Sequence, residues 1–245
     1  MIQPHIQCEK VSKMVLLPGD PKRVDKVMTF LDDAKVIANN REFKSAIGKY
    51  KGMDITVTST GIGGASACIA MEELISCGAE YFVRIGSAGA TQENIKIGDL
   101  IISMASVRED GASSMYIDKS YPAVANYEIL EALKKKAEEL KYNHHVGITR
   151  SHDSFYIDNE MKLMQYWNKK NVLGSDMETA TLYAIGSLRG VKVGSILNNV
   201  VLYNNDVKDG VNEYVNEQDL AQRGEEREII LALEALYEIH KKDLA

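Results

Sequence analysis

The chain has 245 residues, a formal net charge of −6, 45% apolar residues and 26% charged residues. These proportions are ordinary for globular domains and exclude a disordered or fibrous chain. The acidic balance, without any block of like charges, argues against nucleic acid as a partner. The sequence has no apolar run of bilayer length and no signal-like start, so we expect a cytoplasmic protein with no membrane partner. Three cysteines without ligand spacing predict neither a disulfide framework nor a zinc site.

Short apolar runs of strand length alternate with helical stretches along the chain. The predicted strands, which are rich in β-branched or aromatic residues, are Met14–Pro18, Ile55–Thr60, Tyr81–Ile85, Leu100–Met104 and Val191–Leu197. The predicted helices are Glu128–Leu140, Thr179–Arg189 and Glu225–Lys241. The alternation is typical of an α/β fold with a largely parallel sheet. No linker or repeat divides the chain, so residues 1–245 are expected to form one domain.

Three of the predicted strands are followed by segments that contain glycine. Gly19 follows the first strand, Gly61-Ile62-Gly63-Gly64 the second, and Gly86-Ser87-Ala88-Gly89 the third. Ligands of open parallel sheets bind beyond the carboxyl ends of the strands, and glycine lets backbone N–H groups approach an anion. Arg23 and Arg84 are forked donors that suit oxyanions. The pattern therefore predicts a phosphate site.

Glycine turns alone do not decide the ligand, because a tight turn needs glycine whatever it binds. The sequence also lacks the phosphate loop and the dinucleotide fingerprint that glycine-rich motifs can signal. Arg84 is more informative, since an arginine inside an apolar strand would be a costly buried charge unless it meets an anion.

The segment Ser175–Thr179 allows two interpretations. Ser175 or Asp176 could cap the following helix, with Glu178 in its first turn against the helix dipole. Alternatively, Glu178 accepts two hydrogen bonds from sugar hydroxyls while the thioether of Met177 packs beneath the ring. The spacing leaves both interpretations open.

Six motifs, in this order and spacing, cover nearly the whole chain. They are GDPxR at Gly19–Arg23, NREF at Asn40–Phe43, STGIGG at Ser59–Gly64, RIGSAGA at Arg84–Ala90, SFY at Ser154–Tyr156 and DMETA at Asp176–Ala180. Together they resemble the nucleoside phosphorylase-I family, and they are most similar to its uridine phosphorylases. The resemblance implies a single α/β domain with a central twisted, mixed, barrel-like sheet flanked by helices. It also implies reversible phosphorolysis of a nucleoside to a free base and ribose 1-phosphate, with inorganic phosphate as co-substrate and no organic cofactor.

The resemblance also assigns roles to individual residues. The residues it assigns to phosphate are Gly19, Arg23, Arg41, Arg84 and Ser87. The residues it assigns to ribose are His5, Met177 and Glu178, and the catalytic set is Arg84, Glu178 and Arg23. His5 and Arg41 would come from a neighbouring subunit, in a hexamer built from dimers with shared active sites. A potassium ion at the dimer interface would be held by Glu42, Ile62 and Ser66.

The segments that would contact the base depart from the family pattern. In purine members an Asp protonates the leaving base, but the corresponding stretch here, Asn198–Leu202, contains no acid. In uridine phosphorylases a Gln and an Arg follow the Phe-Tyr pair, whereas this chain has Ile157–Lys162. The residues that we expect at the base are Phe155, Asn159, Val200 and Val201, with Lys162 as a nearby cation.

The missing acid favours a pyrimidine, with uridine first, because purine departure benefits from protonation. In the alternative, a purine would be read by Asn198 or Asp206, although buried asparagines more often bond to the backbone. Two other functions compete with a phosphorylase. A nucleoside hydrolase of the same fold has no use for Arg23, Arg41 and Arg84 together, and a non-catalytic nucleoside binder is allowed by the altered base segments. Phosphate-dependent turnover separates the three.

Overall fold

The computed structural model describes residues 1–203 and 219–243, so Asp206 lies outside the described residues. Within these ranges ten strands form one sheet in the order β10-β6-β8-β9-β5-β1-β4-β3-β2, with β7 beside β6. The strands are β1 (Met14–Pro18), β2 (Asp32–Asn40), β3 (Phe43–Tyr50), β4 (Met53–Thr58), β5 (Tyr81–Ala90), β6 (Leu100–Glu109), β7 (Ala123–Val124), β8 (His144–His152), β9 (Gly174–Asp176) and β10 (Lys192–Val201). The helices are α1 (Pro21–Met28), α2 (Gly64–Ser76), the 3-10 turn η1 (Ser113–Met115), α3 (Tyr127–Glu139), α4 (Glu160–Asn168), α5 (Thr179–Arg189) and α7 (Asp219–Asp243).

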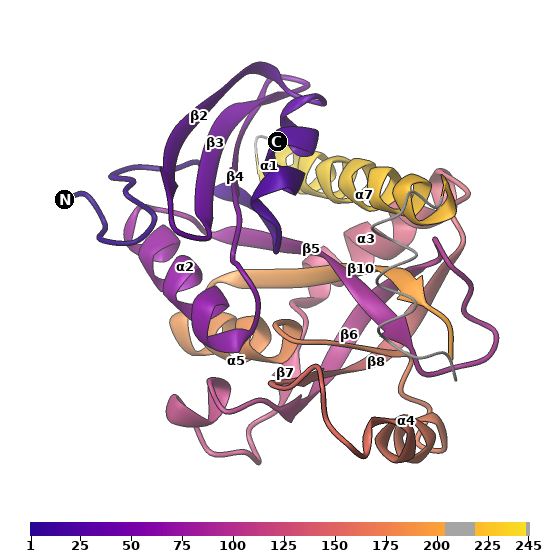
Figure 1. The fold of residues 1–245 in the computed structure, drawn as a ribbon. Helices are drawn as coiled ribbons and strands as arrows, with labels where there is room; N and C mark the ends of the chain where they lie inside the picture. Colours follow the sequence, from indigo (N-terminus) through magenta and orange to yellow (C-terminus); the bar gives the residue numbers. More distant parts are fainter. Residues whose placement is uncertain (204–218, 244–245) are drawn as a thin grey trace.

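Strand β10 closes part of the sheet on itself. It pairs with β5 in parallel and with β6 in antiparallel orientation, so β5, β9, β8, β6 and β10 form a barrel. The other strands, β1, β4, β3 and β2, extend from β5 as a curved wing (Figure 1). Of the ten strand pairings among the described residues, five are parallel. Three of these five join β4, β1, β5 and β10 one after the other. The expected α/β fold with a mixed, barrel-like sheet is confirmed.

The sheet is buried between two layers of helices. Val83 and Ile85 of β5 belong to a core with α1, α3 and α7, whereas Phe82 belongs to a second core with α2 and α5. Figure 1 shows these two helical groups on opposite sides of β5. Successive residues of a strand point to opposite faces, so a strand buried on both faces is apolar throughout, which is the pattern that the sequence showed.

Strand β5 is longer than predicted. The segment Gly86–Gly89 is strand and not the expected turn, because β5 stays paired with β10 through Ser87, Ala88 and Gly89. A Cβ at Gly86 would lie 2.8 Å from the Cζ of Arg84, so glycine here makes room for the guanidinium. The other glycine segment is the predicted turn, since Gly61 and Gly63 have φ of 69° and 89° and lead into α2.

The sequence also missed whole elements. The elements that were not predicted are strands β2, β3, β7, β8 and β9 and helices α1, α2 and α4. β2 alternates exposed and half-buried residues over DDAKVIANN, and β8 carries polar residues over most of HHVGITRSH. Neither segment shows the continuous apolar run that marks a strand buried on both faces.

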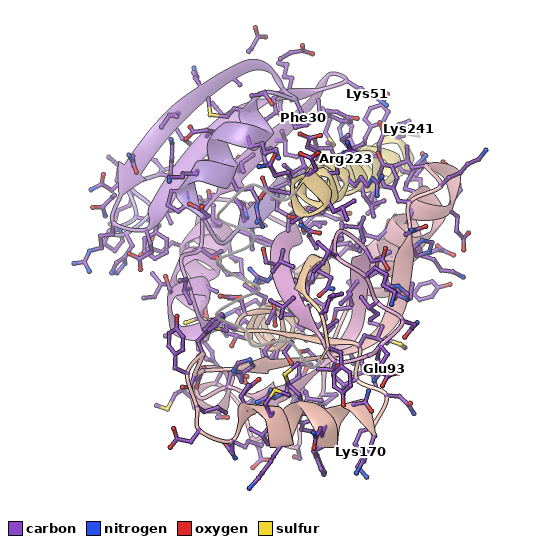
Figure 2. The ribbon with its side chains drawn as sticks, turned by 45° about the vertical axis from the view of Figure 1, so that its right-hand side comes forward. Phe30, Lys51, Glu93, Lys170, Arg223 and Lys241 are labelled. Atoms are coloured by element: carbon purple, nitrogen blue, oxygen red, sulfur yellow. The ribbon has the colours of Figure 1, made fainter. Side chains whose placement is uncertain are left out.

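The wing and the C-terminal helix are joined at their outer ends. Figure 2 shows Lys51 and Lys241 at the same end of the molecule, where the β3–β4 turn meets the end of α7. Their ammonium groups lie 5.4 and 5.3 Å from the ring centre of Tyr237, and Lys51 also pairs with Glu234. Surface cations here fix the wing against α7.

Two further sequence expectations concern membrane spans and the cysteines. Among the described residues, no helix is both long and apolar enough to cross a membrane. Cys8, Cys68 and Cys77 are buried free thiols, and burial raises the pKa of each. They are packing residues of the core that includes α2 and α5.

Candidate active site

Arg84 lies at the centre of the site, near the middle of β5, and is 3% exposed. Its Nε donates to Asp176 Oδ2 at 2.9 Å, and its Nη2 bonds the Glu178 carboxylate. Burial disfavours the charged guanidinium, but the two carboxylates outweigh burial and raise the pKa of Arg84. Its buried Nη1 makes no hydrogen bond to any described residue. Arg84 is therefore a buried charge with donors left for an anion.

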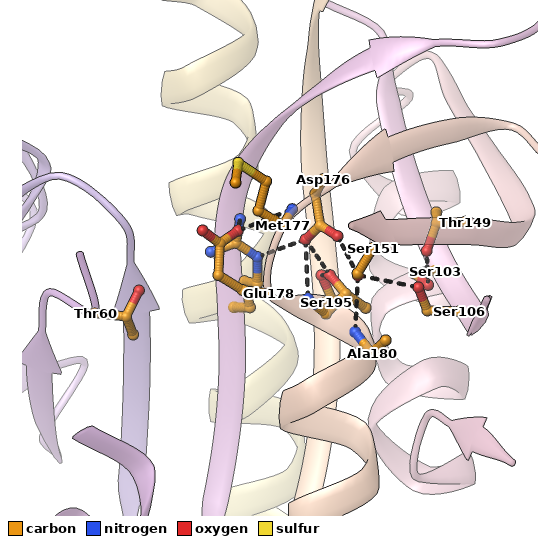
Figure 3. Close-up of polar contacts among 12 residues, drawn as sticks. Thr60, Ser103, Ser106, Thr149, Ser151, Asp176, Met177, Glu178, Ala180 and Ser195 are labelled. Carbon is orange, nitrogen blue, oxygen red and sulfur yellow. Dashed lines mark hydrogen bonds and ion pairs between the residues drawn. The ribbon is translucent and has the colours of Figure 1, made fainter. Parts of the chain in front are cut away.

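Asp176 anchors this arrangement (Figure 3). Its carboxylate accepts hydrogen bonds from Ser151 Oγ at 2.5 Å and from the backbone N and Oγ1 of Thr179 at 3.0 and 2.5 Å. Thr179 is the first residue of α5 and Glu178 is its N-cap residue, so Asp176 accepts from the first N–H of that helix without being its cap. Asp176 thus bonds the start of α5 and at the same time orients Arg84.

Glu178 turns away from the helix and reaches the glycine turn before α2. Its Oε1 accepts from the backbone N of Gly63 at 2.6 Å, and its Oε2 accepts from the backbone N of Met177 at 3.2 Å and from Arg84. Gly63 has φ of 89°, which favours glycine and presents this N–H to the carboxylate. Burial raises the pKa of Glu178, and Arg84 opposes that effect. The carboxylate is thus fixed in place beside the half-buried Met177.

Arg23 lies on the first turn of α1 and reaches β5. It donates to Ile85 O and to Ser87 Oγ, both at 3.2 Å. It also forms ion pairs with Glu225 at 3.0 Å and Glu228 at 3.1 Å, both on α7. Two carboxylates therefore hold the guanidinium of Arg23 against Ser87.

Glu228 is the more deeply buried of these carboxylates, with 0% exposure. It accepts a hydrogen bond from the backbone N of Asn198 at 3.2 Å. Burial raises the pKa of Glu228 to about 8, Glu225 adds to the rise, and Arg23 opposes it. Burial thus favours the protonated form of one of the two carboxyl groups that face Arg23.

Four of the five predicted phosphate residues come together where β1 ends beside β5. Pro18 pairs with Ile85 in register, which brings Gly19 next to the segment that carries Ser87. The carbonyl of Gly19 accepts from the backbone N of Gly61 at 3.0 Å, so the glycine turn joins the same cluster. The list of gathered residues is Gly19, Arg23, Arg84 and Ser87.

His5 and Arg41, the predicted contributions to a neighbour, lie at the edge of the wing. His5 Nδ1 is 2.6 Å from Glu73 Oε1 of α2, and its side chain is 37% exposed. The carbonyl of His5 accepts from Asn40 Nδ2 at 2.8 Å, which ties the N-terminal segment to the β2–β3 turn. Arg41 forms that turn with φ of 55° and is exposed. The side chains of both residues are accessible at the surface of the single chain.

The three residues assigned to potassium are grouped beside Gly61. Ser66 Oγ donates to Glu42 Oε1 at 2.8 Å, and a Cβ at Gly61 would lie 2.6 Å from Glu42 Cγ. Hydrogen bonds from its own backbone and from Ser66 lower the pKa of Glu42, so its carboxylate is charged. Ile62 is 80% exposed. Carboxylate and hydroxyl oxygens suit a hard cation, so the donor set fits potassium.

That donor set differs from a transition-metal site. Among the residues that the structure describes, no three His, Cys, Asp or Glu side chains are grouped so that they could hold a metal. Soft or tetrahedral metals prefer such clusters.

The predicted base residues fall into two groups. Val200 and Val201 end β10, where Val201 pairs in register with Gly89 of β5, and both valines are buried. Phe155, after β8, is half-buried. Asn159 and Lys162, at the start of α4, are exposed.

The two buried asparagines of β10 have backbone partners. Asn198 Nδ2 donates to Ala221 O at 2.8 Å, and Asn199 Nδ2 donates to Lys96 O at 3.1 Å. Both side chains are fully buried. Their amides hold β10 to α7 and to the segment before β6, which is the more common of the two roles considered from the sequence.

Comparison with known proteins agrees with this geometry. Residues 13–236 match the profile of the Phosphorylase superfamily. The chain belongs to this superfamily. A uridine phosphorylase of Thermococcus kodakarensis is 44% identical over 209 residues, which cover 80% of this chain and 76% of that protein.

Other members of the superfamily are similar over comparable lengths. The crystal structure of uridine phosphorylase from Vibrio fischeri ES114 superposes with a TM-score of 0.91 at 46% identity, covering 96% of this chain and 97% of that one. A purine nucleoside phosphorylase of Plasmodium vivax is 41% identical over 199 residues, covering 80% of this chain and 81% of that protein. The resemblance inferred from the six motifs is confirmed.

The sequence analysis did not identify several charged residues that surround the candidate active site. They are Glu225 and Glu228 on α7, which pair with Arg23. The ion pairs of the buried Arg150 with Glu109 and Glu160 were missed as well. A signal existed for Arg150, since it stands among β-branched residues in ITRSH as Arg84 does in YFVRI. The glutamates of α7 gave no signal, because acidic residues are ordinary on an amphipathic helix.

Proposed function

We propose that this chain is a nucleoside phosphorylase, with uridine as its first substrate, that transfers the ribosyl group to inorganic phosphate. The observation that carries the proposal is Arg84, whose Nη2 bonds Glu178 while its Nη1 makes no hydrogen bond within the described ranges. A sugar-binding carboxylate and an anion-binding guanidinium then act at one place. Superfamily membership and the uridine phosphorylases among its relatives support the same reaction.

The reaction needs a nucleophile beneath C1′ and a fixed sugar. An oxygen of phosphate forms a bond to C1′, the C1′–N1 bond breaks with its electron pair passing to uracil, and a proton from solvent neutralises the released base. Arg23, Arg84 and Ser87 orient the phosphate, and its negative charge stabilises the oxocarbenium-like transition state. Glu178 accepts hydrogen bonds from the ribose hydroxyls beside Met177 and so positions the sugar against the phosphate.

Each of the two arginines of the site is paired with two carboxylates of the same chain. Arg84 is paired with Asp176 and Glu178, and Arg23 is paired with Glu225 and Glu228. Phosphate must therefore share these guanidinium groups with carboxylates. The raised pKa of Glu228 helps, because its protonated form competes weakly for Arg23.

The proposal includes a shared site between subunits. Arg41 is exposed on the β2–β3 turn and His5 is half-exposed beside it, so both can reach the phosphate and the 5′-hydroxyl in a second copy. Glu42, Ile62 and Ser66 lie on the same surface and would hold a potassium ion there. We extend this to a cytoplasmic hexamer built from dimers, as in the family that the motifs resemble.

The test is a nucleoside panel assayed with and without phosphate. Uridine, thymidine, inosine and adenosine are incubated with the full chain, and free base is followed. We expect base release only with phosphate or arsenate, with uridine turned over fastest. Base release that is undiminished without phosphate would support a hydrolase, and binding without release would support a carrier.

A purine substrate is the second candidate, since a purine nucleoside phosphorylase is 41% identical over most of the chain. Val200 and Val201 offer no acid to protonate a purine, and general acid catalysis contributes about 10² to 10⁴ in rate. A tenfold or larger preference for inosine or adenosine in the same panel would assign a purine nucleoside as the substrate in place of uridine. The assignment as a phosphorylase would still hold.

A further inference from the structure

One cross-strand row of residues continues from the proposed site over three further strands. In register, Val201 of β10 pairs with Gly89 of β5, Gly89 pairs with Ser175 of β9, and Ser175 pairs with Arg150 of β8. Directly paired residues place their side chains on the same face of a sheet. Val201, Gly89, Ser175 and Arg150 therefore line one face side by side.

This row lies directly beyond the phosphate end of the site. Ser87, which accepts from Arg23, precedes Gly89 by two residues on the same strand and so points to the same face. Two residues along a strand span about 7 Å. A nucleoside with its C1′ above the phosphate at Ser87 would carry its base over Gly89.

The two residues in the middle of the row, Gly89 and Ser175, have small side chains. A Cβ at Gly89 would meet Val201 Cβ at 3.6 Å and nothing nearer among the described residues, and Ser175 adds a single hydroxymethyl group. Gly89 and Ser175 are half-buried, in contrast to the residues on either side of them in β5 and β9. A flat ring can therefore lie on Gly89 with its far edge directed at Arg150.

Arg150 ends the row as a charged side chain with unused donors. It is 2% exposed, its Nε bonds the Glu109 carboxylate, and its Nη1 lies 3.7 Å from Glu160 Oε1, which is too long for a hydrogen bond. Arg150 Nη1, Glu160 Oε2 and Ser175 Oγ are all buried, and none has a hydrogen-bond partner in the part of the chain that the structure describes. Buried polar atoms are seldom left without partners, and here three are neighbours.

The chemistry of these atoms defines the ligand edge that satisfies them. Arginine can only donate and an ionised glutamate can only accept. The complement is a carbonyl oxygen next to a ring N–H, the lactam edge that uracil presents at O4 and N3. Cytosine presents an amino group and a bare ring nitrogen there, which opposes donor to donor and acceptor to acceptor.

We propose that Arg150 and Glu160 read the lactam edge of the base, with Arg150 Nη1 donating to O4 and Glu160 Oε2 accepting from N3–H. This inference rests on the proposed function and adds the residues that set its base specificity. Glu109 is a positioning residue, because it holds the Nε end of Arg150. His152 follows two residues later on the same strand, and burial and the charge of Arg150 lower its pKa, which disfavours a second positive charge beside Arg150.

The test compares two variants with a matched control. Arg150→Met keeps the unbranched stem and removes the donor, and Glu160→Leu removes the acceptor from a residue at the start of α4. Arg189→Met is the control, since Arg189 pairs with Glu72 on the surface away from this row. For each protein, kcat/KM for uridine and 3-methyluridine and the KM for phosphate are measured, with thermal unfolding as the check on folding.

The expected result is specific to the base. Arg150→Met should lower kcat/KM for uridine by about 10- to 100-fold, the effect of losing a hydrogen bond from a charged group. Glu160→Leu should lower it for uridine and leave 3-methyluridine, which has no N3–H, within about twofold of wild type. The KM for phosphate should not change in either variant, and the control should match wild type throughout.

The outcomes separate the two proposals. If wild type shows no phosphate-dependent turnover, the proposed function fails and this inference fails with it. If wild type is active and folded Arg150→Met retains uridine activity within about twofold, Arg150 is only a structural ion pair and the inference alone is wrong. Should Arg150→Met not fold, Glu160→Leu decides, because no described neighbour loses a hydrogen bond to its Oε2. Equal losses on uridine and 3-methyluridine there would overturn the inference.

Discussion

Arg84 and Arg150 are both buried arginines held by two carboxylates, yet their surroundings differ. The carboxylates at Arg84 are bonded further: Asp176 by Ser151 and Thr179, and Glu178 by the backbone of Gly63. At Arg150, by contrast, Glu160 Oε2 has no hydrogen-bond partner among the described residues.

The comparison separates two uses of one residue type. A guanidinium whose carboxylates are already bonded keeps a fixed position, which suits a nucleophilic anion whose placement determines the rate. A guanidinium beside an unsatisfied acceptor offers a donor and an acceptor together, which suits a neutral base edge. Arg84 variants should therefore affect every nucleoside, and Arg150 variants should affect only those with a lactam edge.

The largest effect is expected from Arg84→Met. Removing one donor that stabilises developing charge costs about 10² to 10³ in kcat, and the KM for phosphate should rise as well. The loss should be equal for uridine and for 3-methyluridine, in contrast to Glu160→Leu. Steady-state kinetics with both nucleosides measures it, and a loss confined to uridine would remove the distinction between the two arginines.

The same variant should also destabilise the fold. Asp176 and Glu178 would remain buried without their cation, and breaking a buried ion pair costs about 3 to 5 kcal/mol in the free energy of unfolding. Urea unfolding of Arg84→Met and Arg84→Lys beside wild type measures this cost. The lysine variant should recover part of the stability without recovering the rate.

A smaller effect is expected from Glu178→Gln. The amide keeps the shape of the carboxylate but is a weaker acceptor for ribose hydroxyls, so kcat/KM for uridine should fall by about 10- to 100-fold. For 2′,3′-dideoxyuridine, which has no such hydroxyls, the variant should differ little from wild type. Equal losses on both nucleosides would show that Glu178 acts only as a structural partner of Arg84 and Gly63 and does not bind the ribose hydroxyls.

The smallest effect concerns pH and Glu228. Its pKa is raised to about 8, so as pH rises through 8 the carboxyl ionises and competes with phosphate for Arg23. The groups that face it are Arg23 from α1, Glu225 from α7, Arg84 from β5 and the Asn198 N–H of β10. We expect the KM for phosphate to rise a few-fold between pH 7 and 9 in wild type and to stay flatter in Glu228→Gln.

Glu228 should change the pH dependence of the free energy of unfolding in the direction opposite to that of a carboxylate in an ordinary salt bridge. A carboxyl whose pKa is raised by folding binds its proton more tightly in the folded state, so the free energy of unfolding falls as pH rises from 4.5 to about 8. Glu228→Gln should lose this dependence. Urea unfolding at pH 5 and pH 9 tests it, and parallel pH profiles for the two proteins would show that Glu228 is ionised throughout.

The residues that the sequence identified are those whose local context is unusual. Arg84 interrupts an apolar strand, and Gly61 and Gly63 stand where a strand turns into a helix with positive φ. Physical constraints of this kind are local, so a single segment shows them. The packing residues of β1, β5 and β10 were found for the same reason.

The residues that the sequence did not identify owe their role to distant partners. Glu228 meets Arg23 across more than 200 positions, and Arg150 becomes part of the site only through the pairing of β8 with β9. Asn159, which its place after the Phe-Tyr pair predicts at the base, lies exposed before α4. Pairing order in a closed barrel is a property of the whole sheet, which no segment of it encodes alone.

The central claim is that Arg84 and Arg23 hold phosphate as the nucleophile that accepts ribose. Phosphorus-31 NMR of the full chain with uridine and inorganic phosphate tests this most directly, run beside Arg84→Met. The account predicts a sugar phosphate signal that grows in step with free uracil in wild type and is reduced by about 10² or more in the variant. Uracil released together with free ribose, with no phosphate ester formed, would contradict it.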